Sequence, residues 1–168
     1  NRKIEKVVNG LIRRLNLLEC CDYEKELRIH DWICQNIEYD YEGTNKDKVS
    51  RVIASHNILG VFAYHKDQCE GIAKAVKVLL NAIDVKCIVV TGTAGKNGNM
   101  RPHAWNLVNI DEVSYQLDVT WDMGKSTGDK ISYEYFNLSD ECIVKNHSAD
   151  CKLPECGSRD KTKMESEL

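Results

Sequence analysis

The sequence predicts a single α+β domain in which helices come first and a β-sheet follows. Apolar residues recur at helical spacing through the first half of the chain, whereas runs rich in β-branched residues begin after residue 85. The 168 residues are 42% hydrophobic and 29% charged, which is typical of one soluble globular domain with a substantial core. We expect a helical part at about 1–56, a core at about 57–123 and a C-terminal extension at about 124–168.

Two helices are expected in the first part. Apolar residues follow helical spacing from Ile4 to Leu15, despite the Asn9-Gly10 pair that often breaks helices. A second helix is expected from Asp22, as its N-cap, to about Asn36. His30 lies within it and is expected to be a packing residue, because no partner motif surrounds it.

The segment that follows is less regular. Thr44–Lys48 is polar and predicts a loop, and Val52–Tyr64 predicts one or two short helical pieces. Before them, Tyr39 and Tyr41 either rim a cleft or lie on the surface without a role, since exposed aromatic residues need no function.

A third helix is expected over about 69–83, and a cysteine begins it. Asp67 and Glu70 have the spacing of a capping box, with Asp67 as N-cap. Cys69 then lies in the first turn, where unpaired backbone N–H groups and the helix dipole favour a thiolate, the nucleophilic form. Glu70 opposes this effect, so a cationic partner such as His103 is needed. Without one, Cys69 is an ordinary buried cysteine.

The strands follow this helix. Lys86–Thr91 is β-branched and predicts a central strand, and the glycine-rich Gly92–Pro102 predicts a flexible loop. Next, His103–Ile110 and Val113–Thr120 predict a hairpin, because only the polar pair Asp111-Glu112 separates them. We expect this hairpin to pack against the cysteine helix.

The register of the hairpin brings two polar side chains together. If residue 110 pairs with 113, His103 lies opposite Thr120 and shares one face with Asp118. The two are then diagonal neighbours, close enough for an imidazole–carboxylate hydrogen bond, and we expect both on the side facing the helix. Each residue alone has a structural explanation. Together with a thiol, they have the composition of a nucleophile, its base and the group that orients the base.

Three motifs resemble a known family. They are Cys69-Glu70-Gly71, Pro102-His103-Ala104-Trp105-Asn106-Leu107-Val108 and Leu117-Asp118-Val119-Thr120-Trp121-Asp122. Their order and spacing are similar to those of the transglutaminase-like superfamily, especially its bacterial members, and a looser likeness continues through Tyr135–Asp140 to His147. Ile72 departs from the pattern, because many bacterial relatives have tyrosine there.

The resemblance implies a papain-like fold, with a cysteine helix on an antiparallel sheet. It also implies a triad of Cys69 as nucleophile, His103 as base and Asp118 as the group that orients the base. An upstream side chain would support the oxyanion, with Tyr64 and Gln68 as candidates beside the backbone N–H of Cys69.

Other residues near the triad have two interpretations. Trp105 and Trp121 flank the triad residues on their strands, and either could line a substrate channel or fill the core. Four residues of the C-terminal part offer metal-binding atoms: Cys142, His147, Cys151 and Cys156. Their C-x4-H and C-x4-C spacings do not match structural zinc sites, so we expect no metal and no cofactor. A disulfide among the three cysteines is the alternative.

Charge and hydropathy exclude several classes of protein. The net charge of −3 gives no reason to expect binding to nucleic acid, and no run is long and apolar enough for a membrane span. If one of the eight cysteines is the nucleophile, the remaining seven cannot all form disulfides within the chain. This favours a reducing, cytoplasmic compartment. Nothing resembles a signal peptide, although a cell-surface or secreted protein whose leader was removed would look the same.

Two classes of function therefore remain. In the first, the Cys69 thiolate attacks a peptide or glutamine-carboxamide carbonyl and forms a thioester, which water hydrolyses or a lysine amine takes up. The residues do not decide between a cysteine protease and a cross-linking enzyme. In the second, the domain keeps the fold as a binding or scaffold module without catalysis, which the complete triad disfavours.

Overall fold

The computed structural model describes residues 2–41 and 58–157, and it has the expected α+β fold. Its elements are α1 Arg2–Arg14, η1 Leu17–Glu19, α2 Asp22–Asn36, β1 Glu38–Tyr39, η2 Gly60–Tyr64, β2 Lys66–Asp67, α4 Cys69–Asn81, β3 Cys87–Lys96, β4 Asn99–Ile110, β5 Val113–Leu117, α5 Val119–Lys125, α6 Asp140–Ile143 and β6 His147–Ala149. The predicted loop at residues 44–48, residues 52–57 of the segment expected to hold short helical pieces, and the C-terminal residues from 158 lie outside the described residues, while η2 is one such helical piece.

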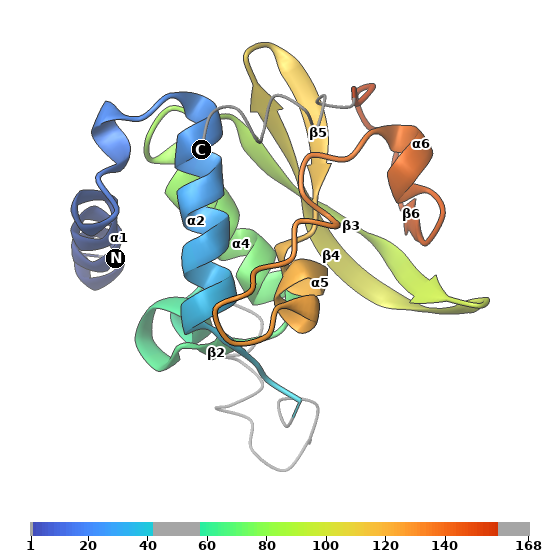
Figure 1. Cartoon of the computed structure of the whole chain (residues 1–168), viewed down its shortest axis with the longest axis horizontal. Helices are drawn as coiled ribbons and strands as arrows, with labels where there is room; N and C mark the ends of the chain where they lie inside the picture. Colours follow the sequence, from blue (N-terminus) through green and yellow to red (C-terminus); the bar gives the residue numbers. More distant parts are fainter. Residues whose placement is uncertain (1, 42–57, 158–168) are drawn as a thin grey trace.

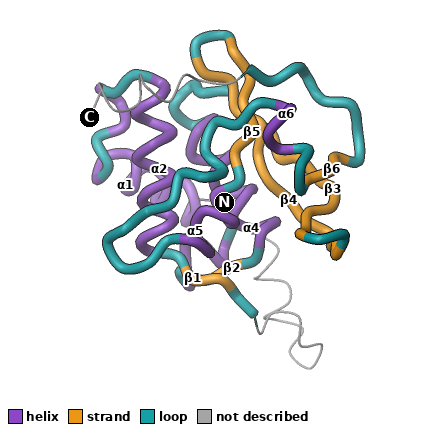
Figure 2. Tube along the Cα trace, turned by 45° about the vertical axis from the view of Figure 1, so that its right-hand side comes forward, coloured by secondary structure: helices purple, strands orange, loops and turns teal. Residues whose placement is uncertain are grey.

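The main sheet is antiparallel, with the strand order β5-β4-β3-β6. Figure 1 shows α1, α2 and α4 on one side of this sheet and α6 on the other. The tube view in Figure 2 shows the same separation of helices from strands. β1 and β2 form a separate parallel pair. None of the helices in the described ranges is long and apolar enough to cross a bilayer.

The core lies between α4 and β4. Ile72, Val76 and Leu79 of α4 are buried, as the helical periodicity predicts, and they pack in one cluster with Val108 of β4. The side-chain amide of Asn106 donates to the Ala73 carbonyl at 2.9 Å, which ties β4 to the helix.

The opposite face of β4 is covered by the C-terminal segment. Trp105 and Leu107 pack there with Cys156. His103 lies on this side too, because side chains alternate along a strand and its ring stacks on Trp105 at 6.1 Å. His103 thus lies on the strand face away from the body of α4 and meets that helix at its first residue, Cys69. Its side chain lies on the side opposite Asn106.

The segment expected to be a loop, Gly92–Pro102, is instead the tip of the β3–β4 hairpin. Asn97 and Gly98 both have positive φ, at 54° and 77°, as a two-residue hairpin turn requires. Gly92 lies within β3, where an added Cβ would stand 2.1 Å from the Ser148 carbonyl of β6. The glycine therefore permits close contact between strands, whereas in the sequence it looked like a sign of flexibility.

The second hairpin has the predicted pairing but is shorter than expected. Ile110 pairs with Val113, which confirms the register, whereas β5 ends at Leu117. Helix α5 begins immediately afterwards, and Asp118 is its N-cap. His103, which pairs with Gly92 of β3, therefore has no partner in β5, and Thr120 lies in α5.

The start of α4 also differs from the prediction. Its N-cap is Gln68 and no side chain caps it, while Glu70 pairs with Lys74 at 2.6 Å instead of completing a capping box. Asp67 is fully buried, and its carboxylate accepts the Gln68 backbone N–H at 2.8 Å. Burial raises the pKa of this carboxyl to about 7. In α2, similarly, Asp22 is the first helical residue, and Cys21 is the N-cap.

Replacing Gly71 by alanine should destabilise the protein, although alanine is the better helix former. A Cβ at Gly71 would lie 2.1 Å from the Asp67 carboxylate, which is buried and held by the backbone N–H of Gln68. Overpacking of this kind costs about 1–3 kcal/mol of unfolding free energy. Urea unfolding measures it, with Gly10→Ala in α1 as control. Gly10 has no atom within 4 Å of an added Cβ, so this change should stabilise by up to about 1 kcal/mol. Equal effects of both substitutions would contradict the prediction.

Candidate active site

The thiol of Cys69 lies at the first residue of α4, half-buried, against the imidazole of His103. Burial raises the pKa of this thiol. A hydrogen bond with His103, the charge of His103 and the backbone N–H groups of Ala104 and Glu70 outweigh burial, so that the pKa lies below its ordinary value. The environment therefore favours the thiolate.

His103 links this thiol to Asp118. Its Nε2 donates to Oδ2 of Asp118 at 2.7 Å, which leaves Nδ1 for Cys69. Burial lowers the pKa of His103. Hydrogen bonds with Asp118 and Cys69 have the opposite and larger effect, and they raise this pKa to about 9. The structure thus brings together the three side chains that the sequence singled out, and the imidazole carries a proton near neutral pH.

Asp118 is held at both carboxylate oxygens. As the N-cap of α5 its Oδ1 accepts the backbone N–H of Trp121 at 3.1 Å, while Oδ2 faces His103. Burial raises the pKa of the carboxyl, but hydrogen bonds from His103 and His147 more than compensate, and the pKa lies below its ordinary value. The carboxylate is therefore ionised, and both of its oxygens accept hydrogen bonds.

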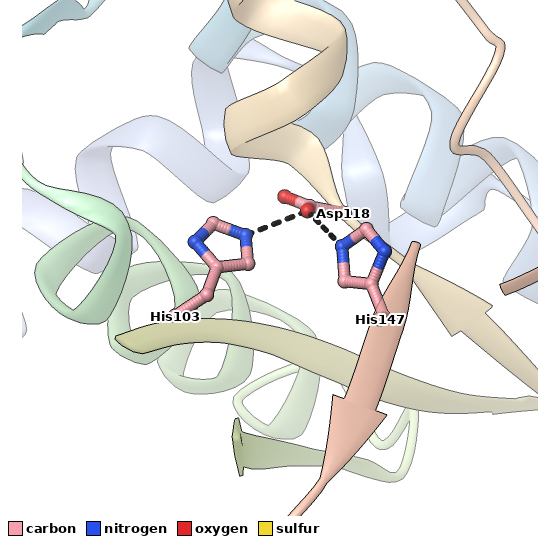
Figure 3. A group of neighbouring side chains, drawn as sticks. All are labelled: His103, Asp118 and His147. Atoms are coloured by element: carbon pink, nitrogen blue, oxygen red, sulfur yellow. Dashed lines mark hydrogen bonds and ion pairs between the residues drawn. The ribbon is translucent and has the colours of Figure 1, made fainter. Parts of the chain in front are cut away.

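A second histidine contacts the same carboxylate oxygen. Nε2 of His147 lies 2.8 Å from Oδ2 of Asp118, and Figure 3 shows the two imidazoles on either side of it. His147 reaches this place because β6 pairs with β3, with His147 opposite Ala94. Sequence reasoning missed this contact. The family likeness extended to His147, but no spacing rule relates it to Asp118.

Tyr39 is one of the residues that sequence reasoning left undecided. Its hydroxyl forms hydrogen bonds with the backbone N–H and the side chain of Cys69. Burial and the neighbouring thiol raise the pKa of Tyr39 to about 12, so the hydroxyl stays protonated. A polar donor from β1 therefore lies beside the thiol.

The two oxyanion candidates from the sequence differ in burial, and their role stays a prediction. Tyr64 is 69% exposed. Gln68 is buried, and its side-chain amide donates to the Asp40 carbonyl at 3.0 Å. Trp105 is a core residue whose indole N–H donates to Gln116 at 2.8 Å.

A cavity of about 430 Å³ opens beside His103. Trp121, Tyr39 and Tyr41 give it aromatic walls, and Lys96 and Lys125 also line it. Trp121 is thus the tryptophan that lies at the cavity, while Trp105 fills the core. Two of its lining residues, His103 and Tyr39, also contact Cys69, which places the cavity near the thiol.

The distances around Asp118 distinguish hydrogen bonds from a shared metal ion. One oxygen of Asp118 lies 2.7 and 2.8 Å from ring nitrogens of His103 and His147. Two ligands of one tetrahedral zinc lie about 3.3 Å apart, since each bond is about 2.0–2.1 Å long. The shorter distances fit N–H···O hydrogen bonds, so the arrangement is a hydrogen-bonded network. That the chain needs no metal stays a prediction.

The C-terminal cysteines do not gather around His147. Cys142 and Cys151 are exposed and Cys156 is buried, and all eight cysteines are free thiols. The disulfide that the sequence left as an alternative is therefore absent from the structure.

His30 is more than a packing residue. Its buried ring lies between two carboxylates, with Nε2 3.1 Å from Asp122 and Nδ1 2.9 Å from Asp31. Burial lowers the pKa of His30, but hydrogen bonds to Asp122 and Asp31 raise it well above its ordinary value. This ion pair joins α2 to α5, the helix that Asp118 caps.

Comparisons with known proteins agree with the fold. A solved structure of a TGase is similar, with a TM-score of 0.62 and 16% identity over 96% of this chain and 44% of that one. A structure of a proposed cysteine protease from Cytophaga hutchinsonii has a TM-score of 0.56 and 17% identity over 86% of this chain and 40% of its own. The present chain thus spans less than half the length of either protein, and at these identities the likeness concerns the fold alone. No curated protein sequence matches the chain.

A family comparison goes further. The sequence model of the transglutaminase-like superfamily matches residues 12–118, which run from α1 to Asp118 and include all three predicted triad residues. This match covers more than half of the chain, and the chain belongs to the transglutaminase-like superfamily.

Proposed function

We propose that this protein is an enzyme that transfers an acyl group through Cys69. The observation that carries the proposal is the position of His103, which bonds the thiol on one side and Asp118 on the other. A thiol with a lowered pKa beside a protonated imidazole is the resting state that a cysteine nucleophile needs.

The first half of the reaction forms a thioester. The Cys69 thiolate attacks the carbonyl carbon of a peptide or glutamine carboxamide, and the carbon–nitrogen bond then breaks. The leaving amine takes the proton of His103, which Asp118 keeps oriented. In the second half an acceptor gives a proton to His103 and attacks the thioester, and the thiolate is released.

Two hydrogen-bond donors are available to the oxyanion that forms in both steps. They are the backbone N–H of Cys69 and the hydroxyl of Tyr39, which bond each other in the resting site. Donors of this kind stabilise charge that develops in the transition state, and loss of one typically costs about 10²–10³ in rate. Tyr39 thus replaces Tyr64 and Gln68 as the side-chain candidate.

The acceptor is water in a hydrolase and a lysine amine in a cross-linking enzyme. Both reactions use the same thioester, so the proposal covers a peptidase, a deamidase or a transglutaminase. A peptide or protein substrate fits the open cavity beside His103.

Trapping of the thioester tests the proposal. Incubation with a library of glutamine-containing and other peptides, followed by acid quenching, should give a covalent adduct on Cys69. The adduct should disappear with hydroxylamine and should not form in Cys69→Ala. Cys34→Ala is the matched control, because Cys34 also lies beside a histidine, at 3.8 Å, but outside the site. An adduct that still forms in Cys69→Ala would contradict the assignment of Cys69 as the nucleophile.

A further inference from the structure

His147 is a buried imidazole that the proposed reaction does not use. It is 3% exposed, which is unusual for a residue with two polar ring nitrogens. Both nitrogens have polar neighbours: Nε2 faces Oδ2 of Asp118, and Nδ1 lies 2.6 Å from Oδ1 of Asn146. Because a carboxylate can only accept, Nε2 carries a proton and donates it.

The orientation of the ring is fixed by its surroundings. Trp121 lies 4.6 Å and Trp105 5.0 Å from it, measured between ring centroids. Asn146 is held in turn, because its side-chain amide donates to the hydroxyl of Tyr135 at 2.8 Å. The proton on Nε2 therefore points at Asp118 without freedom to turn away.

The oxygen it points at is the one that His103 uses. Figure 3 shows both imidazoles converging on this single atom, at 2.7 and 2.8 Å. The other oxygen of Asp118 is occupied by the backbone N–H of Trp121. Each donor withdraws part of the negative charge of the carboxylate. The hydrogen bond from His147 therefore reduces the negative charge that remains to interact with His103.

We propose that His147 is a positioning residue that moderates the effect of Asp118 on His103. Its Nε2 proton holds the Asp118 carboxylate on His103 and shares the negative charge of that carboxylate. Asp118 therefore stabilises the protonated form of His103 less than it would if His147 were absent. The inference rests on the proposed role of His103 as the acid–base residue. Its consequence is an imidazolium that still gives up its proton to the leaving amine at a useful rate, because a weaker base is a better acid.

Other titratable groups lie near His147. His103 faces it at 5.6 Å between ring centroids, and the hydroxyl of Tyr135 lies on the far side of Asn146. Asp140 of α6 and Cys151 line, with His147, a cavity of about 380 Å³. Asp140 accepts hydrogen bonds from Gln116 and the backbone of Cys156 and forms none with His147 among the described residues. The carboxylate that His147 acts on is therefore that of Asp118.

Two substitutions separate this role from simple packing. His147→Gln keeps an N–H at nearly the same reach, whereas His147→Leu fills the space without a donor. The readout is the upper inflection in the pH profile of Cys69 alkylation, where His103 loses its proton, near pH 9 in the wild type. We expect it to rise by roughly half a pH unit or more in His147→Leu and to stay near the wild-type value in His147→Gln. The rate of thioester formation should fall several-fold in the leucine variant only, with KM unchanged.

The results that overturn the inference are distinct. If the two variants give the same inflection, His147 only fills space, and a downward shift in His147→Leu would exclude charge sharing. Should the leucine variant not fold, His147→Phe keeps the aromatic packing and gives the same comparison with glutamine. Failure of the proposed function looks different, because Cys69 of the wild type would then show no enhanced reactivity at pH 6.

Discussion

Replacing His103 by alanine is expected to slow the alkylation of Cys69 by iodoacetamide at pH 6 by about tenfold or more. Burial raises the pKa of this thiol, and only His103 and neighbouring N–H groups reverse that effect. Without the imidazole, the thiol is at best ordinary, and a thiol of pKa about 8.5 is under about 1% ionised at pH 6. Near pH 9 the effect should be much smaller. Peptide mapping by mass spectrometry gives the rate at each cysteine.

The protein carries its own comparators for this experiment. Burial raises the pKa of Cys87 to about 12, and Cys34 lies beside a histidine in a different environment. Asp118→Asn should change the rate at Cys69 in the same direction as His103→Ala but by less, because it removes the charge that stabilises the imidazolium. Cys69 would be a structural cysteine if it reacted no faster than Cys34, or if His103→Ala had no effect at pH 6.

Replacing Asp122 by asparagine should lower the free energy of unfolding by about 3–5 kcal/mol. Asp122 and His30 are a buried ion pair with fully buried side chains, 3.1 Å apart, and removal of Asp122 leaves the buried imidazolium with the partly exposed Asp31 as its remaining carboxylate partner. Asp122 also accepts hydrogen bonds from Ser132 and the backbone of Tyr135, which asparagine can keep in part. Urea unfolding at neutral pH measures the loss.

Asp31→Asn is the matched control, because Asp31 bonds the other nitrogen of the same imidazole. Its side chain is 28% exposed, so water can replace the lost partner, and we expect about 1 kcal/mol or less. If both variants lost the same free energy of unfolding, burial of the ion pair would not determine its contribution to stability.

The pH dependence of this pair has a definite sign. Burial lowers the pKa of His30, and hydrogen bonds to Asp122 and Asp31 raise it well above its unfolded value of about 6.5. A raised folded pKa contributes stability that is complete below about pH 6.5 and is lost as the pH rises through the folded pKa. The difference between the wild type and Asp122→Asn should therefore shrink at alkaline pH. A constant difference through the alkaline range would contradict the ion-pair assignment.

The sequence predicts the site well where local geometry decides it. Helical periodicity located α4, and the two-residue turn between Ile110 and Val113 set the register that brings His103 near Asp118. The reason for that contact was only partly right, however. Asp118 reaches His103 as the cap of a helix, because the chain leaves the sheet at Leu117.

What the sequence could not predict depends on contacts between distant segments. The tip of the β3–β4 hairpin looked like a loop because glycine marks both flexible turns and close strand contacts. His147 and Tyr39 reach the site through the pairing of β6 with β3 and of β1 with β2. No periodicity or spacing along the chain encodes either pairing.

The short strand β6 has a practical consequence for fragments of this protein. Its three residues pair with Gly92, Thr93 and Ala94 on the outer edge of β3. A fragment that ended with the family match at residue 118 would keep every triad residue but would expose that edge. Uncovered strand edges pair with one another, so such a fragment should self-associate into aggregates rather than remain dispersed in solution. The smallest soluble fragment therefore has to extend beyond Ala149, far past the last residue that the chemistry requires.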